Sequence, residues 1–300
     1  MAARVHRGYD KDPQQKGSTI KISTPGTFSA QDAPSTAQDL TPGSTEIVLN
    51  YWREVKFALT DKELTFTTEK IITDHIRPAA YALADDVDTK LCLLYKGTGW
   101  YYNVAGTPTI ADVISARKAL NDLNVPADNR HFMLGSQLEA DFLGLSAFSQ
   151  HQGAGLEGVG TQMRGSLGTK FGFEMFGNNN VQTHTPGVSA DAAGALVGAH
   201  AIGATTVTFD GVTAAGTFLA GDHFVIAGNS QRYVFTASNT AVAGVVTAAA
   251  ISPPLVQAYD ALAVITITLA SKIENLAFHK NAIALAMAPL SEMGNGLGAR

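Results

Sequence analysis

The strongest constraint on the fold of this chain is a stretch almost without charge, residues 185–270. Its only basic residue is Arg232, and its only acids are Asp191, Asp210, Asp222 and Asp260. Between Gly-Asp and Gly-Asn turn signals, short runs typical of β-strands recur at 205–209, 223–226, 231–236, 244–251 and 261–269. Short strands at this spacing predict a small antiparallel barrel or sandwich, inserted into another domain at residues 187–269.

Composition excludes several classes of protein. The 300 residues are 45% hydrophobic, enough for two or three packed domains. A formal net charge of -5 leaves no excess of Lys and Arg for tight DNA binding, so we expect only weak, nonspecific contact with DNA. The single cysteine, Cys92, excludes a disulfide framework and is expected in the core. With no long apolar stretch and no apolar leader, we expect neither membrane insertion nor secretion.

Residues 18–59 read as an extended arm. A strand at 18–23 precedes a loop at 24–44 that is rich in Pro, Gly and small polar residues, and we expect this loop to be mobile. Residues 45–59 carry apolar side chains at largely every second position, which predicts a strand with one buried face. Large aromatic residues on such an element either anchor an interface or pack within the chain. The interface candidates here are Tyr51, Trp52, Arg53 and Phe57.

A long helix is predicted at 68–96, where apolar residues recur in steps of three and four. Thr67 or Thr68 can cap it, and Pro78 should bend or break it. Its acidic residues belong to a solvated face or pair with charges on a neighbouring subunit. They are Asp85, Asp86 and Asp88.

An α/β pattern follows the long helix. The capping-box pair Thr109 and Asp112 opens a helix at 110–123, a strand follows at 130–134, and Ser136 with Glu139 opens a short helix. Residues 153–168 are glycine-rich and expected to form a loop, and 171–176 look like another strand.

Neither a cofactor nor a metal is expected. Gly153, Gly155 and Gly158 have the spacing of a dinucleotide loop, but no hydrophobic strand precedes them, so a flexible loop is the preferred interpretation. The eight histidines include no H-E-x-x-H and no pair at helical i, i+4 spacing. We therefore assign no catalytic, cofactor-binding or metal-ligating residue.

Four groups of residues, in order along the chain, carry a resemblance to a known family. They are VHRGYD (5–10) with KGSTIKI (16–22), IRPAAYALA (76–84), LAGDHFVIAG (219–228), and NLAFHKNAIAL (275–285) with PL (289–290). Together they resemble the coat-protein family of short-tailed phages of the Salmonella type. That family carries an inserted β domain on the Hong Kong-type phage capsid fold.

The resemblance implies an α+β capsid subunit in six parts. They are an N-arm remnant (1–16), a strand and extended loop (17–66), a peripheral domain with a spine helix (67–106), an axial domain (107–186), the inserted antiparallel β-barrel-like domain (187–269), and a return strand into the core (270–300). The family's longer N-arm and a further strand-rich segment at the C-terminal side are expected to be absent from this sequence.

The resemblance also implies a structural function without catalysis. Such a subunit assembles in the host cytoplasm into the hexamers and pentamers of an icosahedral shell that encloses phage DNA. Scaffolding, portal or decoration proteins are its possible partners. The alternatives are an α/β enzyme that uses residues 107–184 and a β-rich binding or adhesin module based on the insert. A perturbed acid or histidine in a concave pocket would favour the enzyme.

Overall fold

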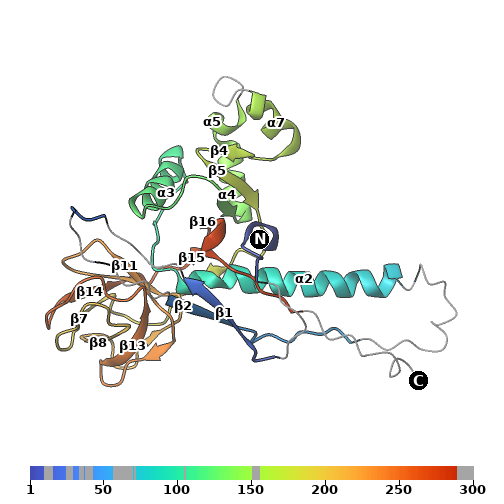
Figure 1. The fold of residues 1–300 in the computed structure, drawn as a ribbon. Coiled ribbons are helices and arrows are strands. Elements are labelled where there is room, and N and C mark those ends of the chain that lie inside the picture. The colour runs from blue at the N-terminus through green and yellow to red at the C-terminus, as the bar shows by residue number, and fades with distance from the viewer. Residues whose placement is uncertain are drawn as a thin grey trace, which may run out of the picture. The chain divides into compact units, whose positions relative to one another are not determined.

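A computed structural model, drawn in Figure 1, describes residues 1–9, 16–24, 30–33, 37, 43–56, 70, 72–104, 106–150 and 156–288. The chain divides into two compact units. The first unit comprises Met1 and Asp85–His279, and the second comprises Ala2–Ala84 and Lys280–Arg300. The boundary between them falls within helix α2 (Arg77–Cys92).

A closed six-stranded barrel dominates the C-terminal part of the first unit. Its order around the barrel is β10-β11-β13-β8-β7-β14, and all neighbouring strands are antiparallel. The strands are β7 (Ala193–Leu196), β8 (Thr206–Asp210), β10 (His223–Ile226), β11 (Arg232–Phe235), β13 (Val246–Ser252) and β14 (Val264–Ile267). The predicted antiparallel barrel is confirmed. The sequence analysis missed β7, because Ala-Gly-Ala-Leu has little intrinsic preference for a strand.

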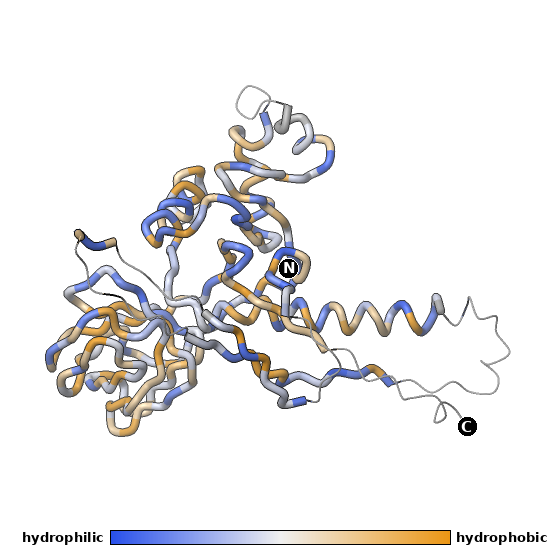
Figure 2. The backbone as a smooth tube through the Cα atoms, viewed as in Figure 1, coloured by the Kyte–Doolittle hydropathy of each residue, from blue (hydrophilic) through white to orange (hydrophobic). Residues whose placement is uncertain are grey.

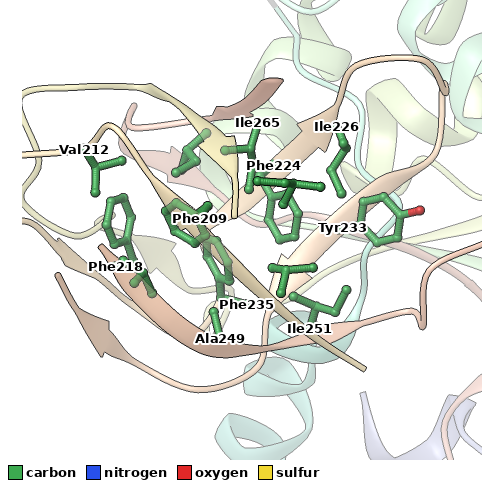
Figure 3. Packing of buried hydrophobic residues seen from close by; sticks show 14 of the residues in the cluster. Phe209, Val212, Phe218, Phe224, Ile226, Tyr233, Phe235, Ala249, Ile251 and Ile265 are labelled. Atoms are coloured by element: carbon green, nitrogen blue, oxygen red, sulfur yellow. The ribbon is translucent and has the colours of Figure 1, made fainter. Parts of the chain in front are cut away.

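Aromatic side chains fill the barrel (Figure 3). Phe209, Phe224 and Phe235 are fully buried, and the rings of Phe224 and Phe235 stack with centroids 4.4 Å apart. The alternating sequence explains this arrangement. In β14, Ile265 and Ile267 point into the barrel and are buried, whereas Val264 on the other face of the same strand remains about half exposed. Each strand thus contributes one apolar face to a common interior. A two-stranded sheet of β9 (Thr217–Phe218) and β12 (Asn239–Thr240) adds to the barrel.

The α/β part of the first unit is built around β3 (Arg130–Leu134), every residue of which is buried. The sheet has the order β16-β3-β5-β4, with β4 (Thr169–Lys170), β5 (Phe173–Gly177) and β16 (Leu276–His279). The return of the chain to this sheet through β16, antiparallel to β3, fits the predicted return strand.

Two helices of this part were predicted, with different success. In α3 (Ile110–Asp122) the capping box is confirmed, since the Thr109 backbone N–H donates to the Asp112 carboxylate at 2.7 Å. Helix α4 (Ser136–Gly144) begins at Ser136, but its N-cap is Gly135. The helix α5 (Ser146–Ser149) follows directly.

The prediction of a loop throughout 153–168 is wrong. Residues Leu156–Arg164 form helix α7, although residues 151–155 lie outside the described part of the chain. Each glycine costs a helix only about 1 kcal/mol relative to alanine, so Gly158 and Gly160 weaken the helix without forbidding it. The dinucleotide-like Gly153 and Gly155 lie outside the described residues, and Gly158 is helical.

The predicted long helix is helical over 72–97 but not uniformly α-helical. A π-helical segment, η3 (Ile72–Ile76), leads into α2, and a 3-10 segment, η4 (Leu93–Gly97), ends it. The change to α-helix occurs at Arg77, next to Pro78, whose missing N–H removes a bond to the preceding turn of the helix. Figure 2 shows α2 banded by hydrophilic and hydrophobic residues, and only Leu91 and Cys92 are buried. Thr67 and Thr68 lie outside the described residues.

In the second unit the predicted arm is an antiparallel pair, β1 (Thr19–Thr24) and β2 (Gly43–Val48). The predicted strand 45–59 is therefore too long. Thr19, the first residue of β1, pairs with Val48, and Leu49 N–H still donates to the Ser18 carbonyl oxygen at 3.0 Å. Within the described residues the pairing goes no further along β2. Residues 49–56 have no regular secondary structure, and most of the loop at 24–44 lies outside the described residues.

Short elements complete the described chain. They are η1 (Ala2–Arg4), β6 (Thr183–His184), β15 (Lys272–Ile273) and η5 (Lys280–Ala282). No helix within the described residues is long and apolar enough to cross a membrane.

Candidate functional site

The aromatic residues of the arm project from the chain. Tyr51 is 68% exposed and Trp52 is 54% exposed. The Arg53 guanidinium carbon lies 5.9 Å from the centroid of the Tyr51 ring, within cation–π range. Intrachain packing therefore covers less than half of either ring. Phe57, the remaining aromatic candidate, lies outside the described residues.

The aspartates of α2 do not form one solvated face. Asp88 accepts hydrogen bonds from Asn178 Nδ2 at 2.7 Å and from the Met1 amino group at 2.7 Å. Asp85 accepts a bond from Asn180 Nδ2 at 2.8 Å and is exposed, while Asp86 is half-buried. The expectation of a solvated face is thus wrong for Asp88, because the turn after β5 places amide donors over it.

The pKa of Asp88 follows from these contacts. Burial by itself would raise this pKa, but the bonds from the Met1 amino group and Asn178 outweigh burial and hold it below its ordinary value. Beside it, Cys92 is buried as predicted, and burial together with the Asp88 charge raises the pKa of the Cys92 thiol to about 11.

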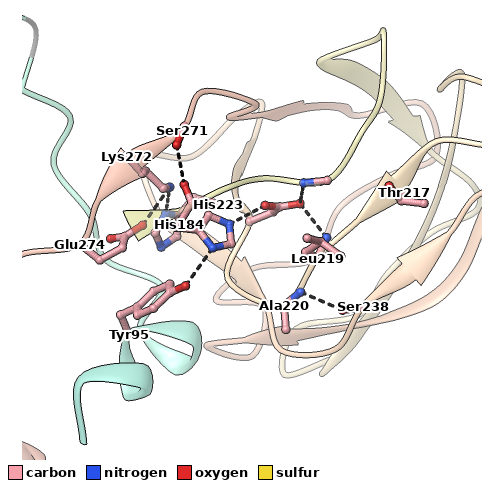
Figure 4. Close-up of polar contacts among 12 residues, drawn as sticks. Tyr95, His184, Thr217, Leu219, Ala220, His223, Ser238, Ser271, Lys272 and Glu274 are labelled. Carbon is pink, nitrogen blue, oxygen red and sulfur yellow. Dashed lines mark hydrogen bonds and ion pairs between the residues drawn. The ribbon is translucent and has the colours of Figure 1, made fainter. Parts of the chain in front are cut away.

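A buried polar chain lies where the barrel joins the α/β part (Figure 4). His184 Nε2 lies 2.7 Å from Asp222 Oδ1, and His184 Nδ1 lies 2.9 Å from the Tyr95 hydroxyl oxygen. The other carboxylate oxygen of Asp222 accepts the backbone N–H of Leu219 at 2.7 Å and that of Gly187 at 3.1 Å. Asp222 is completely buried, so the His184 ring and these two backbone N–H groups replace the water that a carboxylate would otherwise need.

The pKa of Tyr95 fits this environment. Burial, followed by the negative charges of Glu274 and Asp222, raises it to about 12. The hydroxyl therefore keeps its proton and can donate it to His184 Nδ1, which leaves Nε2–H to donate to Asp222.

A second polar group is centred on His223, the residue that follows Asp222. His223 Nδ1 contacts Lys272 Nζ, and His223 Nε2 lies 3.3 Å from the Thr98 carbonyl oxygen. An ammonium group can only donate, so the imidazole accepts at Nδ1 and donates from Nε2–H to Thr98 as a neutral ring. Burial and the Lys272 charge lower the pKa of His223 to about 3. Lys272 in turn lies 3.5 Å from the Glu274 carboxylate.

One cavity, within the second unit, is lined by no residue of these two polar groups. This cavity is half-open and has a volume of ≈ 340 Å³. It is lined by His6, Tyr9, Ile22, Thr45, Ile47, Asn281 and Ala284. The perturbed His223 is buried elsewhere, so the combination that would favour an enzyme is not met at this cavity. Among the described residues, no cluster of three or more His, Cys, Asp or Glu side chains could hold a metal.

The sequence analysis missed the buried polar groups as sites. Asp222 and His223 were read only as part of a strand motif. A signal was present, because Lys272 and Glu274 are the first charges after the charge-poor segment, and charge at a domain edge often marks a contact. Which residues they would meet could not be read from the spacing.

Comparisons with known proteins give structural likenesses only. No protein-family model matches the chain, and no curated protein does. A chain of Mycobacterium phage Che8 is similar with a TM-score of 0.49 and 16% identity, covering 93% of this chain and 90% of that one. A chain from the capsid structure of the Cyanophage P-SCSP1u has a TM-score of 0.43 and 12% identity, with coverages of 97% and 88%.

A third likeness is to a chain in the asymmetric unit of the bacteriophage PhiM1 mature capsid. Its TM-score is 0.39 at 12% identity, covering 92% of this chain and 83% of that one. All three scores lie below 0.5, so no argument about function rests on these likenesses.

Proposed function

We propose that this chain is a structural subunit of a phage capsid shell. The observation that carries the proposal is the exposed arm, in which Tyr51 and Trp52 leave more than half of their surface uncovered. Large aromatic rings contribute strongly to interfaces because they bury much apolar surface at little cost in conformational entropy. An arm that exposes such rings is suited to pack on a neighbouring copy.

The burial of β2 supports an intermolecular role for the arm. Of its six residues only Ile47 is partly covered, and the other five are exposed. Among the described side chains of β1 only Ile20 is buried, and a two-stranded ribbon with so little cover is at best marginally stable in water. Contact with a neighbouring subunit would supply the missing layer.

The sequence resemblance gives the proposal its family. Its segment LAGDHFVIAG spans β10 and the buried Asp222, and NLAFHKNAIAL spans β16 and η5. We propose the Hong Kong-type capsid fold of the short-tailed phage coat proteins, with the six-part division of the chain that the resemblance implies. The barrel is then the inserted domain.

Within that function, copies of the chain form hexamers and pentamers of an icosahedral shell around phage DNA, assembled in the host cytoplasm. Scaffolding, portal or decoration proteins are proposed partners, and contact with DNA is weak because the chain carries a net negative charge. The chain has no catalytic role and no cofactor in this proposal. Arg53, Phe57, Asp85, Asp86 and Asp88 are further candidates for contacts between subunits.

Light scattering and negative-stain electron microscopy test this proposal on the complete gene product. We expect rings or shells at high protein concentration, or on addition of the scaffolding partner. The double variant Tyr51→Ala/Trp52→Ala should suppress them, while Val242→Ala, which removes a 76% exposed side chain of the barrel, should not. A complete product that stays monomeric under every assembly condition would refute the capsid function.

A further inference from the structure

The two ends of the barrel segment are tied together at one place. The chain enters through β6 and leaves through β15, and these strands pair antiparallel, with His184 opposite Lys272. The buried Asp222 carboxylate bonds both the His184 ring and the Gly187 backbone N–H. The β6–β15 pair and this carboxylate therefore form a narrow, well-bonded connection between the barrel and the α/β part.

A second connection runs over the outside of the barrel. Residues 97–102, here called the strap, begin at Gly97, the last residue of η4. The Ser252 hydroxyl donates to the Gly97 carbonyl oxygen at 2.9 Å, and His223 Nε2–H donates to that of Thr98 at 3.3 Å. The strap thus passes from β13 to β10. Because a closed barrel offers no free strand edge, the strap is held by side chains of the wall and not by a strand ladder.

The strap lies directly against the barrel at Gly99. A Cβ atom there would lie 2.4 Å from Pro253 Cδ, 2.7 Å from the Ser252 carbonyl oxygen and 2.9 Å from the Arg232 carbonyl oxygen. Two of these atoms belong to the backbone and cannot move aside easily. Only glycine fits this approach, so the strap is shaped for this position on the wall.

Tyr101 is the side chain that holds the strap. Its ring stacks on the His223 imidazole with centroids 4.3 Å apart and an interplanar angle of 18°. The Arg232 guanidinium carbon lies 4.5 Å from the ring centroid, and Lys272 Nζ lies 5.3 Å from it. Its hydroxyl oxygen lies 3.5 Å from Thr268 Oγ1, which is long for a hydrogen bond. The contacts of the ring face are therefore the stronger ones.

The two connections differ in kind. The β6–β15 connection combines backbone pairing with a fully buried carboxylate, whereas the strap relies on one partly exposed ring and two side-chain bonds. Elements held by few buried contacts open at lower free energy than the rest of a protein. We infer that the strap is a releasable latch, that the β6–β15 pair is a hinge, and that loss of the Tyr101 contacts lets the barrel turn about this hinge. This inference holds whether or not the chain builds a shell.

The two tryptophans make the latch measurable. Trp52→Phe leaves Trp100, next to Tyr101 in the strap, as the only fluorescent indole. In this background Tyr101→Leu removes the ring, and the matched control Tyr101→Phe keeps the ring and removes only the hydroxyl. Losing one ring stack and two cation–π contacts should raise the undocked-to-docked ratio roughly tenfold.

In the isolated full chain, acrylamide quenching of Trp100 fluorescence measures how exposed the strap is. Small-angle X-ray scattering measures whether the barrel changes its position. We expect Tyr101→Leu to increase quenching and broaden the distance distribution, with the thermal unfolding of the barrel unchanged, and Tyr101→Phe to do neither. Equal quenching in both variants overturns the latch. Increased quenching with an unchanged distance distribution overturns the hinge. A lower unfolding midpoint for Tyr101→Leu would make Tyr101 part of the barrel's folding core, which also overturns the inference.

Discussion

The barrel and the arm are both antiparallel β-structure, yet their burial is opposite. In β8 of the barrel, Val207 and Phe209 are fully buried on one face. In the arm, β2 has no residue that is fully covered, and of the described side chains of β1 only Ile20 is buried. A closed sheet provides its own second layer, because its inner faces meet across the interior. A two-stranded ribbon cannot do this. The barrel is therefore covered by contacts within the chain, and the proposed function has a neighbouring copy supply most of the cover that the arm lacks.

The most drastic test of this comparison removes the rest of the chain. Residues 187–269 expressed alone should give a β-type circular dichroism spectrum and a cooperative thermal transition, since the aromatic core lies wholly within them. A peptide of residues 17–56 should give neither. A random-coil spectrum for the first fragment would show that its strands need the surrounding domain, and a folded second fragment would contradict the dependence of the arm on a neighbour.

A single core substitution should have the next largest effect. Phe235→Ala removes a fully buried ring that contacts Phe209, Phe218 and Phe224, and should lower the free energy of unfolding by about 3–5 kcal/mol. Urea denaturation followed by circular dichroism measures it. Val242→Ala, at an exposed position, should change this free energy by less than about 0.5 kcal/mol. Equal costs for the two variants would contradict the packed interior.

Acid should weaken the first unit through His223. The folded protein binds no proton there above about pH 3, whereas the unfolded chain binds one below its ordinary pKa of 6.5. Protons therefore favour unfolding between these values, and the free energy of unfolding should fall by up to about 1.4 kcal/mol per pH unit as the pH is lowered. Above pH 6.5 this contribution is constant.

Urea titrations at several pH values between 7 and 4 measure the slope. Glu274 acts in the opposite direction, because burial raises its pKa and the folded protein binds its proton first. Comparison with His223→Gln isolates the histidine, and this variant should lose the acid-side slope. An unchanged slope in the variant would show that His223 is not held neutral.

The smallest effect on stability is expected at Trp52, which follows the end of β2. Trp52→Ala should change the free energy of unfolding of the isolated subunit by less than about 0.5 kcal/mol, because over half of the side chain already faces solvent. Chemical denaturation of the monomer measures it, with Phe235→Ala as the contrasting variant. A loss of 2 kcal/mol or more would mean that the indole packs within the chain after all.

Features with a local cause were predictable from the sequence. Alternating apolar residues defined β10, whose predicted bounds 223–226 match the structure, and the strand β3 was placed equally well at 130–134. The Thr109 and Asp112 pair marked the start of α3, because a capping box lies within four consecutive residues. In each case the signal and the structure that it causes lie in the same short segment.

Features that depend on a partner were not predictable. Strand β7 exists because β8 and β14 flank it, and β2 ends at Val48 because β1 begins at Thr19. Neither the formation of β7 nor the end of β2 is determined by the residues of that strand itself. Where propensity is weak, pairing decides whether a segment becomes a strand and where it ends.

The candidate surfaces divide in the same way. The sequence by itself marked Tyr51 and Trp52 as aromatic residues on an element with little core, and their exposure agrees with that description. It could not reveal that Tyr101, His223 and Lys272 meet, since they are far apart along the chain. Only the closure of the barrel beside the strap brings them together, and burial there keeps the His223 ring neutral by lowering its pKa.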